Sequence, residues 1–117
     1  MSSYRKQRVA ASVREIISVM IQRGEIKDPR VSTFVQLNEI DIASDFSFAR
    51  IHVSSFESEE ELERSVEGLN AAAGFIQSRL GRQMRTRNTP KLVFKKDTSI
   101  HKGMEINAVI EELHKDS

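Results

Sequence analysis

The stretch NAAAGFIQSRLGRQMRTRNTP, residues 70–90, reads as a helix that is interrupted by Gly74 and then becomes strongly basic. Glycine inside a helix costs about 1 kcal/mol relative to alanine and loosens the backbone. Helical periodicity resumes after the glycine, because Ile76, Leu80 and Met84 fall on one face at steps of four. The stretch therefore predicts two consecutive helices with a break at Gly74. Phe75 lies off this apolar face, and we assign it to the break.

Charge is strongly segregated along the chain, although the net charge is only +1. Residues 79–102 hold eight Lys or Arg against one Asp or Glu, and the arginines of the predicted helix face away from its apolar stripe. Residues 31–60 hold one basic residue against six acidic ones. Such blocks indicate either a basic surface for an anionic partner or charges that are simply solvated. Charge counts alone do not separate these two interpretations.

Before residues 70–90, the spacing of the apolar residues predicts a helix and a β-hairpin. The helix covers about residues 4–23, and strands follow at 33–42 and 48–56. The apolar alternation of the first strand slips by one between Leu37 and Ile40, which predicts a bulge near Asn38–Glu39. Ser58 and Glu61 have the spacing of a capping box at the start of the next helix.

Towards the C-terminus, apolar and polar side chains alternate over residues 89–97, which predicts a third strand. The spacing of the apolar residues within 106–113 predicts a C-terminal helix. The order helix, strand, strand, helix, helix, strand predicts an α+β fold. A mixed three-stranded sheet would carry the helices on one face. We expect one domain over residues 1–117, with residues 115–117 as a frayed tail.

The sequence favours no catalytic site. Its histidines are scattered, it has no cysteine, and no phosphate-binding glycine motif occurs. Glu59–Glu61 are better explained as acidic residues at a helix N-terminus than as a metal site. We therefore expect no enzyme activity, no metal and no cofactor. Neither a membrane-spanning run nor a signal peptide is visible, and the lack of cysteine fits a cytoplasmic protein.

The order of elements resembles that of a type II KH domain, but the GxxG loop of KH domains is replaced by Ala72, Ala73 and Gly74. This triplet resembles the Ala-x-Gly interhelical kink of the ribosome-binding factor A family. The segments RKQRVAASVREIISVMIQRGEIKDPRV (5–31) and EIDIASDFSFARIHVS (39–54) are also similar to that family. Further matches near the third strand are Arg87, Pro90, Leu92, Phe94, Asp97 and Ser99. Ala43 and Phe46 depart from the family pattern.

The resemblance implies a KH-like, monomeric and non-enzymatic protein that binds the immature small (30S) ribosomal subunit through 16S rRNA. It also implies a role in late maturation, including processing of the rRNA 5′ end, that matters most in the cold. Neither a membrane nor a small-molecule substrate is implied. The basic positions are then candidate phosphate contacts: Arg5, Arg8, Arg79, Arg82, Arg85, Arg87, Lys91, Lys95 and Lys96. The sequence shows no aromatic row for base stacking, which favours backbone and shape recognition.

Two alternatives to RNA binding remain. A protein-interaction adaptor could use the acidic hairpin residues Glu39, Asp41 and Asp45 to hold a basic ribosomal protein. A small nuclease would need carboxylates gathered around a metal ion.

Overall fold

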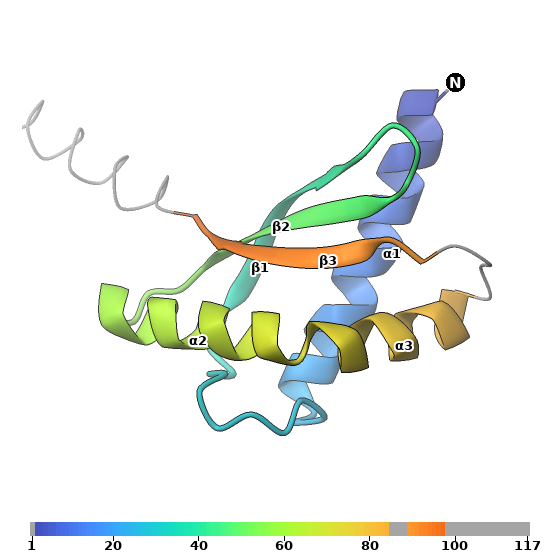
Figure 1. Cartoon of the computed structure of the whole chain (residues 1–117). Coiled ribbons are helices and arrows are strands. Elements are labelled where there is room, and N and C mark those ends of the chain that lie inside the picture. The colour runs from blue at the N-terminus through green and yellow to red at the C-terminus, as the bar shows by residue number, and fades with distance from the viewer. Residues whose placement is uncertain (1, 85–88, 98–117) are drawn as a thin grey trace, which may run out of the picture.

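The computed structural model describes residues 2–84 and 89–97 (Figure 1). The elements are α1 (Ser2–Gln22), β1 (Gln36–Ile42), β2 (Phe48–Ser54), α2 (Glu59–Ala71), α3 (Ala73–Met84) and β3 (Lys91–Lys96). This order confirms the predicted α+β fold. The expected C-terminal helix and the frayed tail lie outside the described residues. Within the described residues, no helix has the length and apolar character needed to cross a membrane.

The sheet has the order β1-β2-β3, with β2 antiparallel to β1 and parallel to β3. Its register shifts between Leu37 and Ile40, which confirms the bulge predicted there. Asn38 anchors the bulge: its Nδ2 donates to Ser54 Oγ at 2.9 Å and to Asp97 Oδ2 at 2.8 Å. The Arg14 guanidinium on α1 donates to the Asn38 carbonyl oxygen at 2.8 Å. The irregular part of β1 is thereby tied to both α1 and the end of β3.

All three helices pack on one face of the sheet (Figure 1). Ala49, Ile51 and Val53 of β2 point into this face and are fully buried. The apolar stripes of the helices cover them, with α1 against β1 and with α2 and α3 against β3. The main helical contributors to the core are Val13, Ile17, Met20, Leu62, Leu69, Ile76 and Leu80.

The break between α2 and α3 lies at Ala72, two residues before Gly74. The Ala72 N–H group still donates to the Gly68 carbonyl oxygen at 3.0 Å, so the chain bends without leaving a helical path. Gly74 itself belongs to the first turn of α3. Phe75 also lies within α3, so assigning it to the break was wrong. At the other end of α2, Ser58 Oγ accepts from the Glu61 N–H group at 3.2 Å, which confirms the predicted N-cap.

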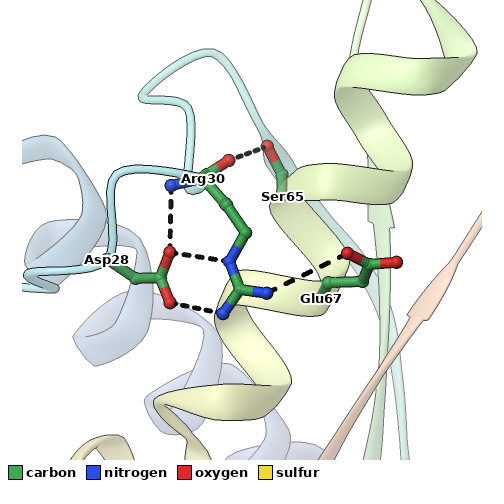
Figure 2. Close-up of polar contacts among 4 residues, drawn as sticks. All are labelled: Asp28, Arg30, Ser65 and Glu67. Carbon is green, nitrogen blue, oxygen red and sulfur yellow. Dashed lines mark hydrogen bonds and ion pairs between the residues drawn. The ribbon is translucent and has the colours of Figure 1, made fainter.

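The loop between α1 and β1 is held by a polar network around Arg30 (Figure 2). Asp28 Oδ1 accepts from the backbone N–H group of Arg30 at 2.9 Å and from its Nε at 3.0 Å, and Oδ2 accepts from Nη2 at 2.8 Å. The Ser65 hydroxyl of α2 donates to the Arg30 carbonyl oxygen at 3.2 Å. These bonds fix the Asp-Pro-Arg turn against α2.

Gly68 lets this loop approach α2 closely. A Cβ atom at position 68 would lie 2.8 Å from Val31 Cγ2 and 3.1 Å from both Arg30 Cβ and Asp28 Oδ1. Gly74 differs, because a Cβ atom there would meet no atom within 4 Å. Gly68 is therefore needed by the fold, whereas Gly74 is not.

We expect Gly68→Ala to lower the free energy of unfolding by about 1–3 kcal/mol, because the added methyl group overpacks the contact with the loop. Gly74→Ala is the matched control. It should leave stability unchanged or raise it by up to about 1 kcal/mol, through the better helix propensity of alanine. Urea unfolding of both variants measures the difference, and equal effects would contradict this account of the two glycines.

Asp28→Asn should destabilise the protein at neutral pH, and the loss should shrink in acid. Hydrogen bonds from Arg30 lower the pKa of the Asp28 carboxyl from its ordinary 3.8 to about 2. A lowered carboxyl pKa contributes stability above the ordinary value, and that contribution is lost as the pH falls through the folded-state value. The difference in free energy of unfolding between wild type and variant should therefore narrow between about pH 4 and about pH 2. A constant difference over this range would show that the carboxylate does not act in this way.

Candidate nucleic-acid interface

An open groove of about 660 Å³ runs between α3 and the turn that joins β1 to β2. Its lining residues are Asp45, Phe46, Ser47, Gly74, Gln77, Ser78, Gly81 and Thr89. The contribution of α3 repeats at helical spacing, so Gly74, Ser78 and Gly81 lie on one face of the helix. Gly74 and Ser78 are exposed there, whereas Thr89 packs against Gly81. A ligand in this groove could lie directly against the helix backbone.

The hairpin turn forms the opposite wall and is held in a defined shape. Phe46 has a φ of 60°, in the left-handed region that non-glycine residues seldom adopt. Its N–H group donates to the Ala43 carbonyl oxygen at 2.9 Å, and Asp45 Oδ1 accepts from the Ser47 N–H group at 3.1 Å. Hydrogen bonds from Ser47 also lower the pKa of the Asp45 carboxyl. Backbone strain of this kind often occurs where a chain contacts a ligand.

The two glycines of α3 have different roles in the groove. At Gly81 a Cβ atom would lie 2.6 Å from Thr89 Oγ1, and Gln77 Nε2 donates to the Thr89 carbonyl oxygen at 3.1 Å. Gly81 therefore allows the segment that leads into β3 to approach the helix. Gly74 lines the groove with open space around it. Nothing in the described part of the chain requires a glycine at position 74.

Three predicted RNA contacts lie beside this groove. The Arg5 Cζ atom on α1 is 5.4 Å from the centre of the Phe46 ring, which places the guanidinium over the turn. Arg82 is exposed one helical turn after Ser78. Lys91 is exposed at the start of β3, two residues after Thr89. Arg5, Arg82 and Lys91 make no ion pair within the described residues, so their charges are available to an anionic ligand.

Two other predicted contacts are engaged inside the protein. Arg79 Nη1 lies 3.5 Å from Glu25 Oε2, and Arg79 Cζ lies 5.7 Å from the centre of the Phe75 ring. Lys96 Nζ lies 2.9 Å from Glu63 Oε1 and also pairs with Glu59; these carboxylates raise the pKa of Lys96. Their charges are partly neutralised, so the structure does not gather all the predicted residues into one basic band.

The remaining predicted positions are spread more widely. Arg8 is exposed on α1, with its Cζ atom 6.0 Å from the centre of the Tyr4 ring, and Lys95 lies on the open face of the sheet. Arg85 and Arg87 lie outside the described residues. Arg50 was missed: it pairs with Val93 in the sheet register, so it is exposed on the same face as Lys91 and Lys95. The alternation of β2 and β3 was the signal that could have found it.

The acidic hairpin proposed for an adaptor is partly used within the chain. Asp41 Oδ2 lies 3.1 Å from His52 Nε2 across the sheet, and Asp45 caps its own turn. Only Glu39 of the three carboxylates is exposed without such a contact in the described structure. The described residues also contain no group of three His, Asp or Glu side chains that could hold a metal ion.

A model of the family described as ribosome-binding factor A matches residues 5–110. The chain belongs to this family. The ribosome-binding factor A of Caldanaerobacter subterraneus subsp. tengcongensis is 39% identical over 112 residues, covering 96% of this chain and 91% of the relative. That of Dictyoglomus thermophilum is 40% identical over 109 residues, covering 93% and 90%. The family resemblance predicted from the sequence is confirmed.

Solved structures of ribosome-binding factor A show the same fold. The crystal structure of the Thermus thermophilus protein matches with a TM-score of 0.64 and 24% identity, covering 78% of this chain and 94% of that one. A Thermus thermophilus homology model fitted into a cryo-electron-microscopy map of a complex with the 30S subunit matches with a TM-score of 0.61 and 24% identity. It covers 76% of this chain and 91% of that one. The family is one of ribosome-binding factors and is not known as an enzyme family.

Proposed function

We propose that this protein is a cytoplasmic, monomeric and non-enzymatic assembly factor that binds the immature 30S ribosomal subunit through 16S rRNA. Residues 1–117 act as one RNA-binding domain. Binding supports late maturation of the subunit, including processing of the rRNA 5′ end, and matters most in the cold. Family membership supports this proposal, together with the ribosome-binding factors named among its relatives.

The observation that carries the RNA-binding part is the exposed part of the α3 face that lines the groove. Gly74 and Ser78 leave the helix backbone open to the groove, so a sugar–phosphate chain could approach it closely there. Arg5 and Arg82 lie at the borders of this groove and make no ion pair among the described residues. Guanidinium groups bind phosphate through paired hydrogen bonds. Phe46 is the single aromatic residue among the described residues that line the groove, so contacts to the RNA backbone outweigh base stacking.

The other basic residues take secondary roles in this proposal. Arg8, Arg85, Arg87, Lys91 and Lys95 extend the positive field, and Arg50 joins the two lysines on the open face of the sheet. Arg79 and Lys96 would have to give up their carboxylate partners before meeting phosphate. We therefore rank these two below Arg82.

Charge reversal at Arg82 and at Arg79 should distinguish a direct phosphate contact from a residue engaged in an internal ion pair. Arg82→Glu should weaken binding to immature 30S subunits roughly tenfold or more, because it removes a charged hydrogen bond and adds repulsion. Arg79→Glu should weaken binding less but lower stability, since it places a second carboxylate beside Glu25. Sucrose-gradient co-sedimentation of the tagged protein with 30S subunits measures binding, and urea unfolding measures stability.

Salt dependence supplies the control for these two variants. If about five phosphates are neutralised, the affinity of the wild type for 16S rRNA should fall with salt at a log–log slope of roughly −3 to −5. Arg82→Glu should reduce the size of that slope by about one. A flat salt response, or full binding by Arg82→Glu, would contradict the proposed interface.

Gly74→Leu should fold normally yet lose RNA affinity. The position has open space around it, so the new side chain fills the groove where the RNA backbone would lie. Filter binding to 16S rRNA measures the affinity, and thermal unfolding confirms the fold. The loss of affinity should exceed any loss of stability. Unchanged binding by a folded Gly74→Leu protein would exclude this part of the groove from the interface.

A further inference from the structure

Two phenylalanines near the N-terminal end of α2 are the most exposed large apolar side chains in the described structure. Phe34 is 71% exposed and Phe56 is 75% exposed. Burying a phenylalanine side chain stabilises a folded protein, so two phenylalanines left in solvent forgo that stabilisation. Single exposed apolar residues are common, but these two line the same groove, of about 470 Å³. The phenylalanine groove is also lined by Gln22, Thr33, Val35, Gln36 and Glu57.

The two rings are presented by a fixed frame. Gln36 pairs with Ser54 at the end of the β1–β2 ladder, and the segments just beyond this pair bring Phe34 and Phe56 to the same groove. Ser32 Oγ donates to Glu57 Oε1 at 2.6 Å and accepts from the Phe34 N–H group at 3.1 Å. These bonds tie the segment bearing Phe34 to the segment bearing Phe56. A partner would therefore meet a pre-ordered surface, which reduces the entropy cost of binding.

The chain around this groove is acidic. Residues 54–63 contain five glutamates and no Lys or Arg: Glu57, Glu59, Glu60, Glu61 and Glu63. Lys96 neutralises part of the charge of Glu59 and Glu63. Glu60 and Glu61 are exposed and make no ion pair within the described residues. The exposed Arg23 and Arg64 offset part of this charge, but the five glutamates outnumber these arginines and Lys96 together. The net negative charge disfavours a phosphate backbone and favours a cation.

We propose that the phenylalanine groove binds a positively charged protein segment with an apolar anchor residue, from a ribosomal protein of the immature 30S subunit. This inference rests on the proposed function. The anchor would pack between Phe34 and Phe56, while its basic neighbours would meet Glu60 and Glu61, the acidic rim of the groove in this proposal. Aromatic residues in a central pocket dominate the energy of many protein interfaces, and a charged rim sets their specificity.

Other occupants fit the charge less well. RNA carries the same sign of charge as the rim. Residues 103–117 of this chain hold four acidic residues against one lysine, so they also match the rim in sign. A second copy in a two-fold contact would set two acidic rims against each other.

This surface is separate from the RNA groove. Figure 1 shows α2 and α3 following one another along the sheet, with the N-terminal end of α2 and the C-terminal end of α3 at opposite sides. The phenylalanine groove lies near the first of these ends, and Arg82 lies near the second. One molecule could therefore contact rRNA and a ribosomal protein at the same time.

Photo-crosslinking identifies the partner directly. We would replace Phe56 with p-benzoylphenylalanine, bind the protein to purified immature 30S subunits and irradiate. The expected product is a crosslink to a ribosomal protein that survives nuclease treatment. The matched control carries the same group at Phe48, on the open face of the sheet, and should not give that product. A crosslink from position 56 to rRNA or to a second copy of this chain, or none, would overturn the proposal.

Binding measurements separate this proposal from the RNA-binding one. The double variant Phe34→Ser/Phe56→Ser should bind immature 30S subunits about ten to a hundred times more weakly, yet bind protein-free 16S rRNA as the wild type does. Glu60→Lys/Glu61→Lys should likewise bind subunits more weakly and should not lose affinity for rRNA. Thermal unfolding checks that both variants fold. Undiminished subunit binding by either folded variant would overturn this proposal alone, whereas a wild type that binds neither rRNA nor subunits would overturn the proposed function as well.

Discussion

The parallel pairing of β2 with β3 is the constraint on which the rest of the structure depends. Parallel neighbours need a long crossover connection, and here α2 and α3 fill it on one side of the sheet. At the end of this crossover, the Lys91 N–H group donates a hydrogen bond to the Ser47 carbonyl oxygen in the hairpin turn at 3.0 Å. That bond sets the start of β3 against the turn, with α3 alongside. The groove between α3 and the turn is thus a direct product of the strand pairing.

Most of the fold could be predicted because local patterns determine it. The phase slip between Leu37 and Ile40 located the bulge, and the spacing of Ser58 and Glu61 located the start of α2. Strand ends were less accurate: β1 was expected from residue 33 and begins at Gln36. Residues before Gln36 continue the apolar pattern, but Ser65 and Gly68 of α2 hold the preceding loop. Contacts with a distant helix end the strand, and no local pattern encodes them.

The candidate site was predicted only in outline, because side chains distant in sequence decide which charges remain free. Arg79 meets a carboxylate 54 residues away and Lys96 one 33 residues away, so a helical wheel could place them on a face but not find their partners. Gly74 illustrates the same limit. The sequence marked it as the joint between two helices, yet the structure puts the break at Ala72 and leaves Gly74 beside an open groove. What distinguishes Gly74 in the structure is the open space beside it, which no pattern in the sequence could reveal.

The separation of charge along α2 and α3 affects how the molecule is oriented as it diffuses toward a binding partner. Glutamates offset the positive end of the α2 dipole, and Arg82 offsets the negative end of α3. With Arg82 at one end and carboxylates at the other, the described pair α2 and α3 carries an electric dipole along its length. Near any large polyanion such a dipole experiences a torque, so diffusion delivers it already turned with its arginines forward. Fewer collisions then have the wrong orientation, and this gain disappears at high ionic strength.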